Sequence, residues 1–475
     1  MNSSANNNEK EDLTNKEKEN LINNTKKVNN NNEINMIIKI NEDDVNKELY
    51  FIDNIDYEND DIKIKSEHNK LKEMNEFNTD LYINGVKYKF QKYFKFEKCG
   101  EYNIKLKLNF LLKDCGFMFY NCKNLTNIDL SNFDTTNAVN MERMFCCCEN
   151  VTNIDLSNID TKNVTTMRSM FFGCNKLKYI DTSRFDTKNV IDMTSMFNGC
   201  EGLLSLDLSN FNTKNTKEMI QMFYDCKSLT NINLLSFNTE KIINMEGMFS
   251  CCHSLTDLDL SNFNTKNVKD MTQMFLECKN LKKVNISSFD TQNVKTIEGL
   301  FDGCENLTNI DLSHFNTKNV LDMSFVFHRC KKLTNINISN FDTQNVTNMK
   351  SMFSMCQSLI SINLSNFDTS NVKEMSQMFY GCHNLFYIDL SNFKTDKLTN
   401  INGMFSYCDS LTSINISKFN IDNIKEMNFT FYGCHNLSKI YLSLSNNKNY
   451  STKKKLFFNC LNIPDIYLSY FGEEA

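Results

Sequence analysis

Residues 174–200 read CNKLKYIDTSRFDTKNVIDMTSMFNGC, and closely related segments follow one another along most of the chain. Sequence repeats of about 20 to 50 residues are typical of solenoids, propellers and arrays. A propeller blade needs four strands and usually roughly 40 residues, so this shorter unit predicts a single coil of a solenoid. Fourteen cysteines mark the register at a constant interval of 26 residues: Cys122, Cys148, Cys174, Cys200, Cys226, Cys252, Cys278, Cys304, Cys330, Cys356, Cys382, Cys408, Cys434 and Cys460.

The first half of each unit has the pattern of a short β-strand. Leu177 and Ile180 are followed two residues later by another apolar position, which is Leu in most units, as at Leu156 and Leu208. Alternation of apolar and polar residues with period 2 predicts a strand with one buried face.

The second half of each unit has the spacing of a helix face. Asn189 directly precedes it and Asp192 follows three residues later, an arrangement that resembles an N-cap with its capping box. The alternative is an inward asparagine ladder that hydrogen-bonds the turn backbone of the neighbouring coil. The apolar positions recur at i, i+3, i+6, i+7 and i+10, which predicts a helix of two to three turns: Val190, Met193, Met196, Phe197 and Cys200.

The predicted fold class is therefore an α/β solenoid. It is a leucine-rich-repeat-like, right-handed stack of about 13 coils, each with one short parallel strand and one short helix. No coil can bury its apolar faces alone, so stacking creates the core. The predicted parts are a disordered tail rich in Asn, Lys and Glu, a small β-rich cap, the solenoid and a degenerate capping repeat, at residues 1–33, 34–113, 114–442 and 443–475.

Composition excludes several classes of protein. Lys and Arg number 52 against 58 Asp and Glu, a net charge of −6, whereas nucleic-acid-binding domains are strongly basic. No stretch approaches the ~18–20 apolar residues of a membrane helix, and polar residues follow Met1 where a signal peptide would be apolar. We therefore expect a cytoplasmic protein, with the cell surface as the alternative location.

The cysteines and histidines do not form a recognisable catalytic or metal-binding motif. Each repeating Cys belongs to the apolar stripe, which predicts buried free thiols rather than disulfides. The adjacent cysteines at 146–148 and 251–252 lack paired zinc-ligand spacing. A histidine follows the repeating Cys at His253, His383 and His435, but other units carry Lys, Glu, Asn or Gln there. We predict a non-enzymatic protein without a cofactor or a resident metal.

A polar ladder on the strands is the candidate binding site. It holds one Asp or Asn per unit, and in nearly every unit a serine stands two residues after it. The sheet of such a coil lines the concave side, where solenoids usually bind. The first four rungs are all Asp, so a basic protein partner, or less favourably a divalent cation, would relieve their repulsion. The alternative is that these residues merely solvate the sheet. The ladder consists of Asp129, Asp155, Asp181, Asp207, Asn233, Asp259, Asn285, Asp311, Asn337, Asn363, Asp389 and Asn415.

The repeat resembles the BspA-type leucine-rich-repeat family. The motif Ile-Asp-Leu-Ser-Asn-Phe-Asp-Thr-x-Asn-Val-x-x-Met-x-x-Met-Phe-x-x-Cys-x-x-Leu is nearly complete at residues 154–177 and 362–385, and the resemblance covers about residues 114–470. It implies a leucine-rich-repeat-like solenoid and, as in bacterial surface members, adhesion to host proteins or other cells. We therefore expect a protein–protein interaction scaffold, or alternatively an extracellular adhesin.

Overall fold

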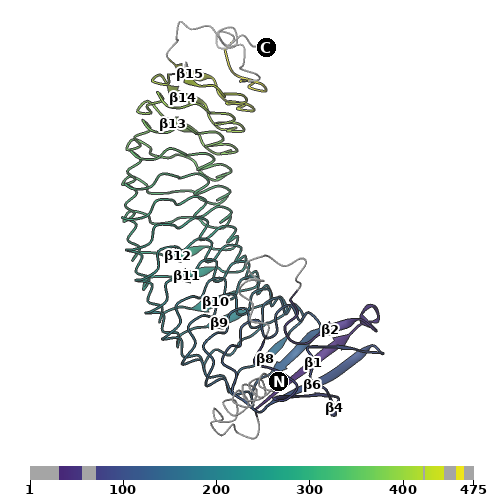
Figure 1. The fold of residues 1–475 in the computed structure, drawn as a ribbon. Coiled ribbons are helices and arrows are strands. Elements are labelled where there is room, and N and C mark those ends of the chain that lie inside the picture. Colours follow the sequence, from purple (N-terminus) through teal and green to yellow (C-terminus); the bar gives the residue numbers. More distant parts are fainter. Residues whose placement is uncertain (1–31, 56–70, 421–422, 443–455, 465–475) are drawn as a thin grey trace, which may run out of the picture.

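The computed structural model describes residues 32–55, 71–420, 423–442 and 456–464. Figure 1 shows a curved stack of coils with a small sheet at its N-terminal end. The predicted tail (residues 1–33) falls almost wholly outside the described residues. Most of the predicted C-terminal capping repeat (443–475) does so as well.

The N-terminal part is built from short antiparallel strands. A hairpin turns at Asn84-Gly85, a pair that favours type I′ turns: Leu81 lies opposite Tyr88, and both turn residues adopt positive φ, 47° and 81°. Two positive φ values are the mark of a type I′ turn. The elements are β1 (Glu33–Ile40), the 3₁₀ turn η1 (Glu42–Asp44), β2 (Glu48–Tyr50), β3 (Thr79–Ile83), β4 (Val86–Tyr88), β5 (Tyr93–Lys95) and β6 (Gly100–Leu108).

Strand β1 joins this part to the stack. It lies antiparallel between β6 and β7 (Leu125–Asp129), so that Met36 faces Ile104 on one side and Ile128 on the other. Strand β7 is the strand of the first coil, and the resulting sheet has the order β4-β3-β6-β1-β7-β8. Because an uncovered strand edge invites aggregation, β1 protects the N-terminal end of the stack.

The strand half of the repeat is confirmed. Neighbouring coils pair in parallel with an offset of one unit, as at Leu206 opposite Ile232 and at Ile388 opposite Ile414, which in turn lies opposite Ile440. About twelve coils stack in this way. The strands after β7 are β8 (Asn153–Asp155), β9 (Ser205–Asp207), β10 (Asn231–Asn233), β11 (Asp257–Asp259), β12 (Lys283–Asn285), β13 (Tyr387–Asp389), β14 (Ser413–Ile416) and β15 (Lys439–Leu442).

The helix expected in each coil is wrong: no α-helix occurs among the described residues. Backbone donors in this half alternate between two directions. The N–H groups of Ser195 and Phe197 donate to the carbonyls of Ile220 and Met222 in the next coil, at 2.9 and 3.0 Å. The N–H of Met196, between them, instead donates to a carbonyl three residues earlier in its own coil. The segment is a ribbon of tight turns that pairs with its neighbours on both sides.

Left-handed backbone explains why the helix cannot form. Ser195 and Gly199 have φ of 54° and 73°, and the equivalent Phe325 and Arg329 have 58° and 57°. A right-handed helix cannot contain a residue with positive φ every fourth position. A turn that repeats every four residues also brings positions i, i+3, i+4 and i+7 to one side, so its apolar pattern imitates that of a helix.

The asparagine at position 189 belongs to a ladder, and its interpretation as a helix N-cap is wrong. Asn189 Nδ2 donates to the backbone carbonyl of Lys162 in the preceding coil at 2.7 Å. The side chain is exposed, so the ladder follows the surface and not the interior. The same bond recurs at Asn163, Asn215, Asn267, Asn293, Asn319, Asn345, Asn371 and Asn423.

Stacked phenylalanines form the largest part of the core. From Phe119 to Phe457, rings on neighbouring coils lie nearly parallel with centroids 5.2 to 6.0 Å apart. A second column begins at Phe185 and reaches Phe263 with spacings of 6.1 to 6.3 Å. Offset aromatic pairs add about 0.5–1.5 kcal/mol beyond the burial of their area, so each coil stabilises both neighbours.

The repeating cysteines are confirmed as free thiols inside the stack. Thirteen are fully buried and the last, Cys460, is partly buried. From Cys148 onward each Sγ donates to the carbonyl of a Phe 29 residues earlier, at 2.8 to 3.2 Å. Burial disfavours the thiolate and raises the pKa of Cys382 to about 12.

Removing one ring from the middle of the Phe column tests its contribution to stability. Phe275 is fully buried between Phe249 and Phe301, at 5.9 and 5.3 Å. We expect Phe275→Ala to lower the free energy of unfolding by about 3–5 kcal/mol, because it leaves a cavity between two coils. The measurement is urea denaturation, with Phe77→Ala as control. Phe77 is 86% exposed, so its replacement should change stability by less than about 0.5 kcal/mol.

Thiol labelling tests the packing of the cysteine column. A maleimide pulse on the folded protein at neutral pH should modify the exposed Cys99 and spare the thirteen fully buried column thiols from Cys122 to Cys434, because they are buried and protonated. In guanidinium chloride all should react, as read by peptide mass spectrometry. Column cysteines that react as fast as Cys99 in the folded protein would show that the coils do not pack in this register.

Candidate functional site

All twelve residues of the predicted ladder lie on the strand face, one per coil, and each stabilises its own turn. Asp155 Oδ1 accepts the backbone N–H of Ser157, and Asn363 Oδ1 accepts that of Ser365. Equivalent bonds, 2.8 to 3.3 Å long, occur on every rung. Side chains of Asp and Asn form such Asx turns equally well. The regular Asp/Asn pattern therefore has a structural cause, whatever else it does.

The turn hydrogen bonds also lower the pKa of some ladder carboxylates. The hydroxyl and backbone N–H of Ser183 lower the pKa of Asp181, and the N–H and hydroxyl of Ser209 lower that of Asp207. Hydrogen bonds to the charged form stabilise it. In both residues these bonds outweigh the desolvation of the carboxylate, which acts in the opposite direction.

Charge is concentrated at the N-terminal end of the ladder. Beyond Asp207, amide rungs separate most carboxylates, and Asn285 Nδ2 donates to Asp259 Oδ1 at 2.9 Å. At the first rung, Asn35 of β1 donates to Asp129 at 3.4 Å. Between these regions Asp155, Asp181 and Asp207 follow one another without an amide rung.

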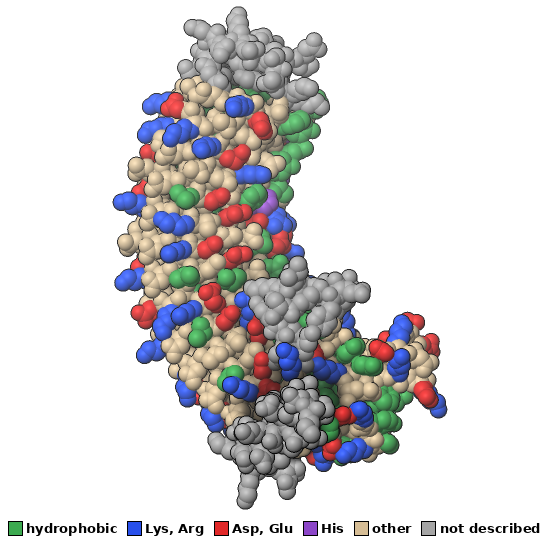
Figure 2. All heavy atoms as spheres, in the orientation of Figure 1, with side chains coloured by type: hydrophobic (Ala, Val, Ile, Leu, Met, Phe, Trp, Pro, Cys, Tyr) green, Lys and Arg blue, Asp and Glu red, His purple; other side chains and the backbone are tan. Residues whose placement is uncertain are grey.

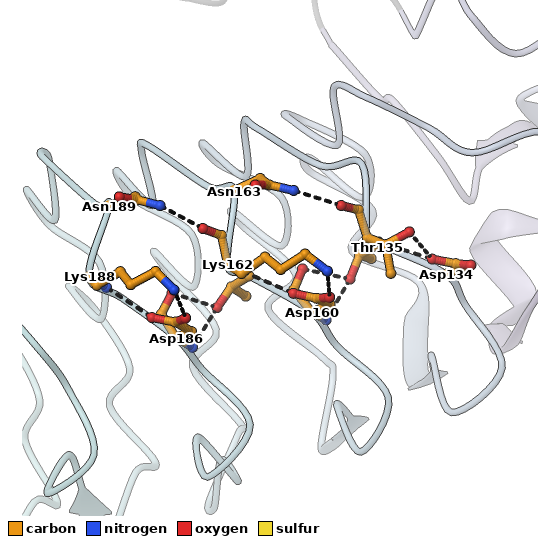
Figure 3. Close-up of polar contacts among 10 residues, drawn as sticks. Asp134, Thr135, Asp160, Lys162, Asn163, Asp186, Lys188 and Asn189 are labelled. Atoms are coloured by element: carbon orange, nitrogen blue, oxygen red, sulfur yellow. Dashed lines mark hydrogen bonds and ion pairs between the residues drawn. The ribbon is translucent and has the colours of Figure 1, made fainter. Parts of the chain in front are cut away.

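A second polar column runs beside the strands, and Figure 3 shows it on two consecutive coils. Thr135 Oγ1 donates to the carbonyl of Asp160 at 3.0 Å and accepts its N–H at 2.7 Å. The Asp160 carboxylate in turn accepts the N–H and the Nζ of Lys162, at 3.0 and 2.8 Å. Thr161 repeats the arrangement with Asp186 and Lys188. Lys162 and Lys188 thus pair with carboxylates of the second column.

The threonine column was missed by the sequence interpretation. These hydroxyls are buried and hydrogen-bond to the next coil. Several act as donor and acceptor together, namely Thr135, Thr161, Thr187, Thr213, Thr291 and Thr369. The signal was present, because a threonine occupies this position in every coil from Thr135 to Thr395, although the neighbouring positions vary. Its members are Thr135, Thr161, Thr187, Thr213, Thr239, Thr265, Thr291, Thr317, Thr343, Thr369 and Thr395.

An open groove of about 1070 Å³ lies between the two columns on the first coils. Its lining includes Asp134, Asp160 and Asp186 with Arg184 and several asparagines and serines. Acidic and amide groups predominate, so the groove suits a polar, basic ligand better than an apolar one.

The cysteine and histidine pairs do not assemble into a reactive centre. His383 and His435 both turn to the carboxylate of Asp409, at 2.7 and 3.1 Å, while Cys382 and Cys434 donate to buried backbone carbonyls. Cys146 and Cys147 have their Sγ atoms 3.6 Å apart. Within the described ranges, no group of three or more His, Cys, Asp or Glu side chains is arranged to hold a metal ion.

No helix in the described part of the chain is both long and apolar enough to cross a membrane.

Comparison with solved structures finds leucine-rich-repeat receptors. The TLR13–ssRNA13 complex matches with 14% identity, 68% coverage of this chain, 60% of that chain and a TM-score of 0.21. The Drosophila Toll–Spatzle complex matches with 12% identity, coverages of 59% and 49%, and a TM-score of 0.21. The matched region thus spans less than two thirds of either receptor chain. The solenoid fold is shown by the hydrogen bonds and side-chain ladders that join neighbouring coils.

Comparison with sequences gives a family. No curated protein matches the chain. The family described as "Mycoplasma protein of unknown function, DUF285" matches residues 60–153, 85–203, 148–257, 244–361 and 360–465. Together these matches extend from 60 to 465, which is most of the sequence, and the chain therefore belongs to the DUF285 family.

Proposed function

We propose that this protein is a non-enzymatic interaction scaffold whose strand face binds a basic segment of a partner protein. The observation that carries the proposal is the uninterrupted run of carboxylates at Asp155, Asp181 and Asp207. They occupy successive coils, separated by the ~4.8 Å spacing of neighbouring strands. Ion pairing in these coils involves Asp160, Asp186 and Asp192 instead. A basic partner would provide complementary charge for the run.

The regularity of the surface supports a scaffold over an enzyme. Catalysis needs different groups that converge on one reacting atom. On the strand face, the same two or three polar residue types recur at the same position in each coil, so no described rung differs chemically from its neighbours in the way that a nucleophile or a general base does. Extended, repeated surfaces are what solenoids use to bind other macromolecules.

Removal of charge without removal of the turns tests this function. We expect the triple variant Asp155→Asn, Asp181→Asn and Asp207→Asn to fold normally, because Asn233 and Asn285 make the same turn bond in their own coils. Binding of the partner should fall at least tenfold, and wild-type binding should weaken with added salt. The measurement is affinity capture from the source cells with quantitative mass spectrometry.

A charge-matched control separates this site from general acidity. The variant Glu149→Gln, Glu201→Gln and Glu305→Gln also removes three carboxylates, each from an ion pair with a lysine near the surface. A protein retained by the wild type and by this control, but lost by the aspartate variant, supports the proposal. Identical capture by all three baits contradicts it.

The second candidate function is that of a BspA-like extracellular adhesin, and the repeat motif at residues 154–177 and 362–385 supports it. The same strand face would then bind a host or cell-surface protein. Protease added to intact source cells discriminates between the candidates. An adhesin should be cleaved from the outside, whereas an intracellular scaffold should be cleaved after lysis alone.

A further inference from the structure

The turn-ribbon half of the unit, which follows the strand half in the chain, differs from its regular pattern near the C-terminal end of the stack. Four successive coils each carry an aromatic residue there, namely Tyr380, Tyr407, Tyr432 and Phe458, and Phe429 lies among them. The position of Tyr380, Tyr432 and Phe458 is aromatic in some earlier coils as well, at Tyr120, Phe172 and Tyr224, whereas the position of Tyr407, directly before the repeating Cys, is aromatic in no other unit. These rings are additional to the buried Phe column, so the core does not account for them.

The five rings form one continuous aromatic surface, hereafter the aromatic groove. Tyr407 stands edge-on to Tyr380 and to Tyr432, with centroids 5.6 and 5.1 Å apart, and Tyr432 stacks on Phe458 at 5.7 Å. Phe429 and Phe458 are 43% and 52% exposed. Figure 2 shows hydrophobic side chains along one edge of the stack towards this end. Large exposed aromatic surface indicates a binding site.

Amide side chains are held in fixed positions beside the rings. Asn400 and Asn402 both donate to Glu426 Oε2, at 3.1 and 2.8 Å. Asn402 Oδ1 accepts the backbone N–H of Asn428 at 2.7 Å. In the backbone beneath them, the N–H of Gly403 donates to a carbonyl of the next coil. Each amide still has donor or acceptor capacity towards the groove.

A glycine opens the space between these groups. Gly403 has φ of 60° and stands where the neighbouring coils carry Gln377 and Phe429, both also with positive φ. A Cβ at Gly403 would meet Ser406 Oγ at 3.3 Å and Gln377 Cγ at 3.5 Å. The groove has a volume of about 670 Å³, within the ~300–1,000 Å³ range of small-ligand sites.

We propose that the aromatic groove binds a neutral oligosaccharide. Among the described residues that line it, Lys350 alone is charged, so the lining does not favour an ionic ligand. The faces of Tyr and Phe rings are electron-rich and attract the polarised C–H groups on one face of a sugar ring. Amides, which both donate and accept, suit its hydroxyls. Such a site is chemically distinct from the acidic strand face and can be occupied independently of it.

Calorimetric titration of the full chain tests the proposal. The probes are maltohexaose, cellohexaose, mannohexaose and N-acetylchitohexaose, with decaproline as a peptide probe that also favours aromatic grooves. We expect at least one saccharide to bind. Tyr432→Ala should weaken that binding at least tenfold because it removes the ring shared by Tyr407 and Phe458. Tyr224→Ala, at the equivalent position of an earlier coil, should leave it unchanged.

A second variant fills the groove instead of removing a ring. Gly403→Phe places a side chain that the same backbone position already carries at Phe325 and Phe429, with φ of 58° and 57°. It too should weaken saccharide binding at least tenfold, with the unfolding midpoint unchanged. The proposal is overturned if none of the four saccharides binds, if binding survives Gly403→Phe, or if decaproline is the probe that binds and is lost in that variant.

Discussion

The hydrogen bonding between coils is the constraint on which the structure depends. Alternate backbone N–H groups cross to the next coil, Asn189 and its equivalents bond back to the preceding one, and the buried threonine hydroxyls bridge both. Every bond joins positions a fixed number of residues apart. A single insertion would move donors away from acceptors in all the ladders at once, leaving buried polar groups unpaired at a cost of about 1–3 kcal/mol each. This explains the unbroken 26-residue interval.

The same constraint places identical side chains next to one another. Phenylalanine rings and thiols tolerate such stacking because they are neutral and can pack on copies of themselves. Ionised groups tolerate it less well, and the strand ladder shows how they are accommodated: its carboxylates bond to the turns, and amide rungs interrupt the series beyond Asp207. The acidic run at Asp155, Asp181 and Asp207 departs from this interrupted series, because no amide rung separates its carboxylates.

A site could be predicted from the sequence where its residues recur at the repeat interval. The strand ladder was predictable because its residues repeat, and the structure places all twelve on one face. The aromatic groove was not predicted, because its rings come from three different positions of the unit, as at Tyr380, Tyr407 and Phe429. They meet when left-handed turns bring those positions together on adjacent coils. The threonine column shows the opposite case, since its repetition was visible while its hydrogen bonds were not.

The sequence by itself determined that the chain is a stack of coils, that short strands pair in parallel between coils, and that the thiols lie inside, because periodicity and apolar pattern depend on chain order. It also determined the hairpin at Asn84-Gly85, whose turn chemistry is local. The tertiary structure alone decided between helix and turn ribbon after Val190. The two share an apolar spacing, and the choice depends on whether backbone donors bond within their own coil or across to the next, which is a property of the assembled stack.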